Sequence, residues 1–179
     1  ALQQLHFEPA LAAKPLVMGI VNPTSDSFSD GGQFLDPADA VTHAVQLVDE
    51  GANIIDIGGQ STRPGALPVS LDAEIARVIP VIEGVRKKCD VLISIDTSKA
   101  EVPRRALASR AQIINDVTAL RDDPEMLAVA ANSDAGLIVM HMLGTPKTMQ
   151  TAPTYDDVVA DVTAFLREQL TRLTRNGVA

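Results

Sequence analysis

Five short apolar segments in this 179-residue chain each end on polar side chains that could bind or polarise a substrate. These strand-end residues are, in chain order, Asn22, Asp56 with Gly58, Asp96, Asn115 with Asp116, and Met140 with His141. Because the carboxyl ends of parallel strands gather at one edge of a sheet, we expect these side chains to converge there.

A carboxylate and an amide on consecutive segments form the most informative pair. Asp96 ends the run LISID, and a carboxylate in such a place must be paired or hydrogen-bonded. It could accept two adjacent N–H groups of an aminopyrimidine ring, or it could cap a helix that begins near Ser98. Asn115 offers both a donor and an acceptor, although a strand-end asparagine can also be a turn residue. Together, at one height on neighbouring strands, the two favour a flat heteroaromatic ligand.

Polar loops after the first two segments supply groups suited to anions. The amide oxygen of Asn22 could bind Mg²⁺, or the residue could open a turn before proline. Thr62 and Arg63, in the run STRPG, suit a phosphate or carboxylate. Phe28 stands in an otherwise polar loop, where an aromatic side chain is expected to contact a ligand or to fold back on the protein.

The sequence contains few candidates for a reactive side chain. His141 and Lys147 could help to bind an anion, with a structural role for the histidine as the alternative. The sequence shows no Ser/His/Asp order, zinc-ligand spacing or phosphate-cradling loop. The predicted site therefore works by positioning and by stabilising a leaving group, without covalent catalysis.

Apolar and amphipathic segments alternate along the chain. Short β-branched runs predict buried parallel strands, and residues of helical periodicity predict the segments between them. The strands are expected over 16–21, 53–57, 91–95, 112–114 and 136–140, and the helices over 38–50, 71–87, 100–110, 124–132 and 155–176. Gly51 and Asn176-Gly177 should end helices, Asp123-Pro124 should start one, and Pro80 should kink the second helix or shift its start.

Five βα repeats predict an α/β fold with a parallel sheet. Polar residues end all five strands, and no G-x-G-x-x-G follows the first. Both features favour a (β/α)₈ barrel over an open doubly wound sheet. Such a barrel usually needs about 250 residues, so we expect this chain to hold about the first five units of one domain that is truncated on its C-terminal side.

Composition narrows the class of partner. The net charge of −8 argues against nucleic acid or an anionic membrane surface. The single cysteine, Cys89, excludes an intramolecular disulfide. We expect no membrane span and no signal peptide, and hence a cytoplasmic protein.

The motifs, in order, resemble those of bacterial dihydropteroate synthase. They are N-x-T-x-D-S-F-S-D-G-G, D-I-G-G-x-S-T-R-P-G-A, S-I-D-T, I-N-D and M-H-M-x-G-T-P-x-T-M-Q, all within residues 18–150. The resemblance implies a TIM-barrel transferase of folate biosynthesis. Such an enzyme condenses 6-hydroxymethyl-7,8-dihydropterin pyrophosphate with p-aminobenzoate, in a Mg²⁺-assisted step, to give 7,8-dihydropteroate and pyrophosphate. Sulfonamides compete with p-aminobenzoate.

The same resemblance implies roles for individual residues. Asn22 would bind Mg²⁺ and face the pyrophosphate, while Asp96 and Asn115 would hold the pterin ring. These three would form the catalytic set. The remaining implied substrate contacts are Met140 near the pterin, Thr62 at the pyrophosphate, and Ser61, Arg63, Pro64 and Phe28 around p-aminobenzoate and sulfonamides.

Three departures from the family pattern stand out. Pro23 gives NPTSD where the family usually reads N-V-T-P-D, and Gln60 stands where the family usually has Glu. The later third, with a further pterin-binding aspartate, a loop lysine and an S-x-R-x-H segment, is absent. We therefore expect the isolated chain, a single pterin-binding domain over residues 1–179, to show little or no synthase activity. A turnover rate like that of an intact synthase would contradict this.

Two other functions stay open. One is a pterin-dependent methyltransferase of the same superfamily, which the F-S-D-G-G and S-T-R-P-G loops speak against. The other is a non-catalytic pterin-binding fragment, which the absent later third favours. The expected partners are small-molecule substrates, and a homodimer is neither indicated nor excluded.

Overall fold

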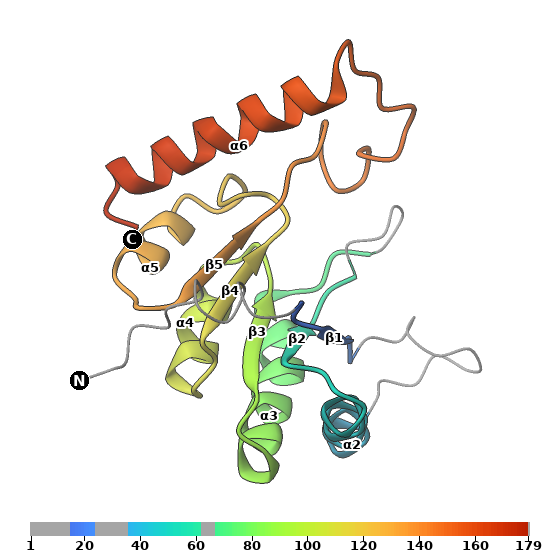
Figure 1. Ribbon diagram of the computed structural model, residues 1–179. Coiled ribbons are helices and arrows are strands. Elements are labelled where there is room, and N and C mark those ends of the chain that lie inside the picture. The colour runs from blue at the N-terminus through green and yellow to red at the C-terminus, as the bar shows by residue number, and fades with distance from the viewer. Residues whose placement is uncertain (1–14, 24–35, 62–66, 179) are drawn as a thin grey trace.

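The computed structural model describes residues 15–23, 36–61 and 67–178, in which strands and helices alternate (Figure 1). The strands are β1 (Met18–Val21), β2 (Ile54–Gly58), β3 (Leu92–Asp96), β4 (Ile113–Asp116) and β5 (Gly136–Val139). The helices are α2 (Pro37–Asp49), α3 (Leu71–Lys88), α4 (Glu101–Ala108), α5 (Met126–Ala131) and α6 (Val158–Arg175). The alternation expected from periodicity is confirmed, with boundaries displaced by a few residues.

All five strands are parallel, and they lie in the sheet in chain order, β1-β2-β3-β4-β5. An open doubly wound sheet reverses its strand order at a switch point, whereas a barrel adds each strand beside the last. The described chain thus has the α/β architecture of five successive units of a (β/α)₈ barrel, as expected.

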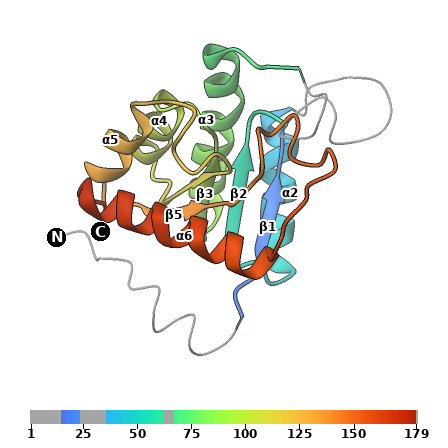
Figure 2. The ribbon, with the colours of Figure 1, turned by 90° about the horizontal axis from the view of Figure 1, so that it is seen from above.

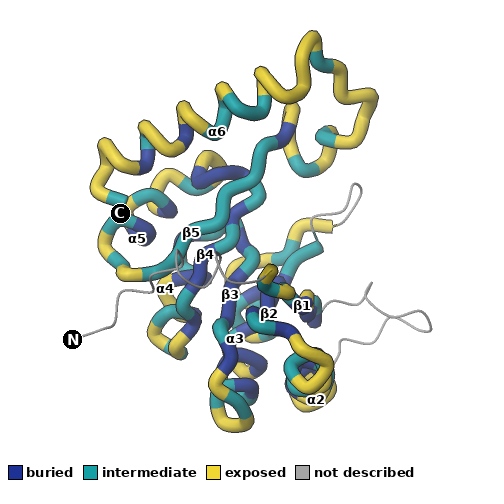
Figure 3. Tube along the Cα trace, viewed as in Figure 1, coloured by how far each residue is buried: buried dark blue, intermediate teal, exposed yellow. Residues whose placement is uncertain are grey.

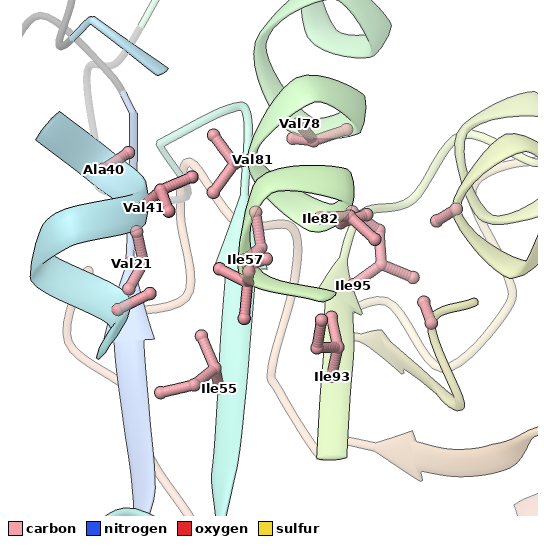
Figure 4. Close-up of a cluster of buried hydrophobic side chains, with 14 of the residues drawn as sticks. Val21, Ala40, Val41, Ile55, Ile57, Val78, Val81, Ile82, Ile93 and Ile95 are labelled. Carbon is pink, nitrogen blue, oxygen red and sulfur yellow. The ribbon is translucent and has the colours of Figure 1, made fainter. Parts of the chain in front are cut away.

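The main core lies between the sheet and the helices that follow its first strands (Figure 4). Every residue of β2 is buried. Ile57 and Ile95 are fully inaccessible, as are Val78 and Ile82 of α3, which pack in the same cluster. Burial of each such aliphatic side chain contributes about 1.5–3 kcal/mol, so this core fixes how the strand ends are aligned.

A second, smaller cluster joins Met126 of α5 to Leu173 of α6. Seen from above, α6 lies on the side of the sheet away from α2 and α3 (Figure 2). Its exposed and half-buried turns alternate along the tube in Figure 3, as is typical of an amphipathic helix with one covered face. Among the described residues no helix has the length and apolar character to span a membrane.

Polar side chains cap the starts of α2 and α3, and glycines follow the ends of α2 and α6. The side chain of Asp36 accepts from Ala38 N at 2.9 Å just before α2, and Ser70 accepts from Ala73 N at 3.3 Å at the start of α3. Gly51 adopts a φ of 110° after α2, and Gly177 a φ of 83° after α6. The predicted glycine stops are confirmed, because this backbone region favours a residue without Cβ.

Two prolines near helices have been singled out in the sequence. Helix α3 begins at Leu71 and runs through Pro80 to Lys88, so of the two predicted effects of this proline a shift of the helix start is not seen. Pro80 is exposed, where its ring meets solvent and the helix loses one backbone hydrogen bond. Helix α5 begins at Met126, two residues after Pro124. As predicted, the Asp123 carboxylate accepts a hydrogen bond in the turn that leads into this helix, from Glu125 N at 2.9 Å, and its other oxygen accepts from Ala100 N before α4, at 2.8 Å.

Candidate functional site

Strand register brings the predicted rim residues into two rows. In the upper row Gly58 pairs with Asp96, and Asp96 pairs with Asn115, across β2, β3 and β4. Two residues earlier in each strand, in the lower row, Asp56 pairs with Ser94. The expectation that Asp96 and Asn115 lie at one height on neighbouring strands is therefore confirmed.

Gly58 keeps space open between two of the predicted site residues. A Cβ built there would lie 2.6 Å from the Asn22 side-chain oxygen and 3.4 Å from Asp96 Oδ2. Real Cβ atoms do not approach an oxygen as closely as 2.6 Å, so only glycine fits without a shift of the Asn22 side chain. The amide of the β1 loop and the carboxylate of β3 thus border the same small space.

The Asn115 amide makes a hydrogen bond that the sequence did not reveal. Its Nδ2 donates to Asp56 Oδ2 at 3.1 Å, and not to the neighbouring Asp96. Asp56 is 5% exposed, yet its Oδ1 has no partner among the described residues, and neither has the buried Ser94 hydroxyl beside it. Buried polar atoms are nearly always paired, so these unmatched atoms mark the floor of the site as unusual.

Burial raises the pKa values of the carboxyl groups at this rim. The pKa of Asp96 is raised to about 7, first by burial and then by the negative charges of Asp56, Asp116 and Glu74. No hydrogen bond from the described residues reaches its carboxylate. Burial also raises the pKa of Asp56, against the opposing effects of the Ser94 hydroxyl and the Asn115 amide.

Asp116, although buried, has a structural role. Its Oδ1 accepts from Thr118 N and from Thr118 Oγ1, both at 2.8 Å, and its Oδ2 accepts from Leu120 N at 3.0 Å. Burial raises its pKa while these bonds lower it. The carboxylate is fully engaged in holding the turn after β4.

A cavity of about 310 Å³ opens beside Asp96 at the strand ends. Its lining includes Ser61 and the loops after β3, β4 and β5. Neither Asn115 nor Asn22 is among the described residues that line it. The ring expected between Asp96 and Asn115 would thus lie over the sheet, with this cavity to one side.

A buried glutamate ties the β2 loop to the loop after β3. Glu74, 1% exposed, accepts from Thr97 Oγ1 at 2.6 Å and forms an ion pair with Lys99. Lys99 Nζ also donates to Gln60 Oε1 at 2.7 Å, and that oxygen accepts from Val69 N at 3.2 Å. The network joins both ends of the segment that carries Ser61.

The alternative role of Asp96 as a helix cap is not seen. Helix α4 starts five residues later, at Glu101. The backbone N–H groups just before it are taken by Thr97 Oγ1, at 3.3 Å from Lys99 N, and by Asp123. The carboxylate of Asp96 is therefore left for another partner.

Other predicted site residues fall in three groups. Met140 follows β5 and is half-buried, as is Ser61. His141 packs edge-on to Phe165, with ring centres 5.0 Å apart, and this contact supports the structural alternative for the histidine. Phe28, Thr62, Arg63 and Pro64 lie outside the described residues.

Few protein groups at this site could hold a metal ion. Within the described residues, no group of three or more His, Cys, Asp or Glu side chains could hold a metal ion. Asn22, half-buried at the end of β1, offers one amide oxygen beside Gly58. A single neutral oxygen suits an ion such as Mg²⁺ that keeps several waters and binds substrate phosphates.

Asp56 and Glu74 are the contributors to the site that sequence reasoning did not place. The sequence indicates Asp56 only as a strand-end residue without a role, and it places Glu74 only within an amphipathic helix. A carboxylate inside the apolar run IIDIG was a usable signal. No comparable local signal marked Glu74, because its partners lie more than twenty positions away.

Comparison with known proteins agrees with this geometry. A family model described as "Pterin binding enzyme" matches residues 18–179. Dihydropteroate synthase of Escherichia coli K12 is 50% identical over 165 residues, which cover 92% of this chain and 58% of that protein. The chain therefore spans about three-fifths of that relative's length.

Solved structures show the same likeness. A Yersinia pestis dihydropteroate synthase, in complex with a sulfonamide drug, has a TM-score of 0.87 and 44% identity, covering 93% of this chain and 60% of that one. A Xanthomonas albilineans dihydropteroate synthase with 4-aminobenzoic acid has a TM-score of 0.84 and 47% identity, covering 93% and 59%. Because the family model matches residues 18–179, which is nearly the whole chain, the chain belongs to the pterin-binding enzyme family.

Proposed function

We propose that this chain is the pterin-binding part of a dihydropteroate synthase. The observation that carries the proposal is the row of Gly58, Asp96 and Asn115, aligned by strand register, with Asn22 beside it. The similarity to named synthases over more than nine-tenths of the chain supports the same reading. The substrates are 6-hydroxymethyl-7,8-dihydropterin pyrophosphate and p-aminobenzoate, and the products are 7,8-dihydropteroate and pyrophosphate.

The residues act by holding and aligning a ring. The ionised Asp96 accepts adjacent N–H groups of the aminopyrimidine, and the Asn115 oxygen accepts a further donor. The C–O bond to pyrophosphate then breaks, and the amine of p-aminobenzoate forms the new C–N bond and loses a proton. This needs no protein nucleophile, which agrees with the absence of a Ser/His/Asp order in the sequence.

Magnesium fits the group that the chain offers. The Asn22 oxygen would supply one ligand, and the pyrophosphate and water would complete an octahedral shell. When bound, the ion neutralises charge that builds on the leaving pyrophosphate. Thr62 and Arg63 would approach the same anion, and Ser61, Pro64 and Phe28 would border p-aminobenzoate and sulfonamides. Met140 would pack near the pterin.

The test combines calorimetry with a product assay. The chain is titrated with 6-hydroxymethylpterin, and pyrophosphate release is followed with the two substrates and Mg²⁺. Binding with product formation supports the synthase, and binding without release supports the non-catalytic fragment. Methyl transfer from a methylated folate to a corrinoid would support the methyltransferase. If no pterin binds, the proposal is wrong, and Asp96→Asn is the control for binding at the proposed site.

We also infer a cytoplasmic location and small-molecule substrates in place of nucleic acid, in keeping with the net charge of −8. Sedimentation of the purified chain would settle whether it forms a homodimer.

A further inference from the structure

We infer that Asp56 is a positioning residue, whose carboxylate fixes the Asn115 amide so that its oxygen is presented to the ligand. The inference rests on the proposed function and adds to it a residue with no assigned role. Asp56 lies two residues below the rim residue Gly58 on β2, and its Oδ2 accepts from Asn115 Nδ2 at 3.1 Å.

The chemistry of the pair selects one amide orientation. An asparagine side chain can present either its oxygen or its NH₂ group to a given direction, and the two forms have nearly the same shape. An ionised carboxylate accepts hydrogen bonds and cannot donate them. Asp56 therefore holds the NH₂ side of Asn115, and the Asn115 oxygen, which has no hydrogen-bond partner among the described residues, is left for an incoming N–H group.

A purely structural role for Asp56 does not fit its surroundings. A carboxylate retained for stability is expected to have both oxygens hydrogen-bonded, as those of Asp116 are. Asp56 is 5% exposed, and the Ser94 hydroxyl opposite it is near enough to lower its pKa but makes no well-formed hydrogen bond to its free oxygen. Burial of this kind destabilises the free chain, so the residue serves the site above it.

The arrangement also defines what the ligand must offer. Asp96 and the oriented Asn115 present acceptors side by side on β3 and β4. With Asp56 beneath, no donor faces the ligand from this pair of residues. The edge that binds there must therefore carry neighbouring N–H donors, and a ring that presents acceptors at the same positions would be rejected.

The experiment compares three variants for binding of 6-hydroxymethylpterin by calorimetry. Asp56→Ala frees the amide to rotate and should weaken binding about tenfold, the effect of losing one well-placed hydrogen bond. Asp56→Asn keeps an acceptor for Asn115 but can also donate to it, so it selects the amide orientation less strictly and should weaken binding by about threefold. Ser94→Ala, a change in the same buried row, is the matched control and should leave affinity unchanged.

Two further measurements separate positioning from loss of fold. Asp56→Ala should unfold at a temperature no lower than the wild type, since it removes an incompletely paired buried carboxylate. Asn115→Ala should weaken binding in the wild type but add little in the Asp56→Ala background, because the two residues act as a unit. Wild-type affinity in Asp56→Ala would overturn the inference.

Failure of the proposed function gives a different result, because then the wild-type chain binds no pterin. The inference is still tested in that case by NMR of the Asn115 side-chain NH₂ group. Its protons should exchange slowly in the wild type and in Asp56→Asn, and rapidly in Asp56→Ala. Equal exchange in all three would show that Asp56 does not hold the amide.

Discussion

Replacement of Asp96 by asparagine should stabilise the ligand-free chain, and by an amount that grows with pH. The pKa of Asp96 is raised from 3.8 to about 7, so between these values the folded chain holds a proton that the unfolded chain releases. Stability contributed by this group is thus present below pH 4 and is lost as the pH rises to about 7. Each tenfold change in proton affinity corresponds to about 1.4 kcal/mol, so the loss at pH 8 is about 4 kcal/mol.

Asp96→Asn cannot ionise and escapes that loss. We expect its free energy of unfolding to exceed that of the wild type by about 4 kcal/mol at pH 8, and to match it within about 1 kcal/mol at pH 4. The chain has no tryptophan and one tyrosine, so urea unfolding is best followed by far-UV circular dichroism. Asp56 and Asp116 are present in both proteins, and part of the expected gain comes from relieving their repulsion with the ionised Asp96. A gap that stays constant from pH 4 to pH 8 would refute the reasoning.

Four further predictions follow from contacts around the rim. Glu74→Gln should lower the free energy of unfolding by about 1–3 kcal/mol in urea melts, because it removes the buried partner of Lys99, whose side chain is 29% exposed and can partly resolvate. Gly58→Ala should weaken Mg²⁺-dependent ligand binding in calorimetry with little change in melting temperature, since its Cβ displaces the Asn22 side chain. By contrast, Gly59→Ala should destabilise the fold by about 1–3 kcal/mol, because its Cβ would lie 2.8 Å from the packed Cγ of Glu74. Pterin affinity should fall about tenfold per pH unit below about pH 7 in calorimetric titrations, as the ligand-binding carboxylate of β3 takes up a proton; affinity that is level from pH 5 to pH 8 would contradict this.

The fold could be predicted because its signals are local. A wholly buried parallel strand such as β2 has a continuous apolar run, and helix ends such as that at Gly51 have a glycine in a left-handed conformation. Contacts with distant partners could not be predicted. Asp123 caps the turn before its own helix, as the sequence indicates, but its carboxylate also reaches Ala100, twenty-three positions earlier.

The candidate site was predictable to the level of strand ends and no further. The position of Asp96 and Asn115 at the ends of consecutive strands followed from the segment boundaries, and parallel pairing then placed them together. The bond between Asn115 and Asp56 joins residues 59 positions apart on strands that are not neighbours. It depends on side-chain direction and on the curvature of the sheet, which no local pattern in the sequence encodes.

Three aspartates at this end of the sheet differ in how fully their oxygens are hydrogen-bonded, and this difference indicates different roles. Asp116 accepts three hydrogen bonds from its own turn and is satisfied without a ligand. Asp56 has one oxygen unmatched, and no hydrogen bond from the described residues reaches Asp96. For Asp96 the missing donors must come from whatever binds, and a donor-rich ring edge supplies them in the geometry that the strands fix, while Asp56 acts through the Asn115 amide that it holds. The same unmet hydrogen bonding that destabilises the free chain near neutral pH is thus a source of affinity, and ligand binding should release a proton wherever Asp96 is protonated beforehand.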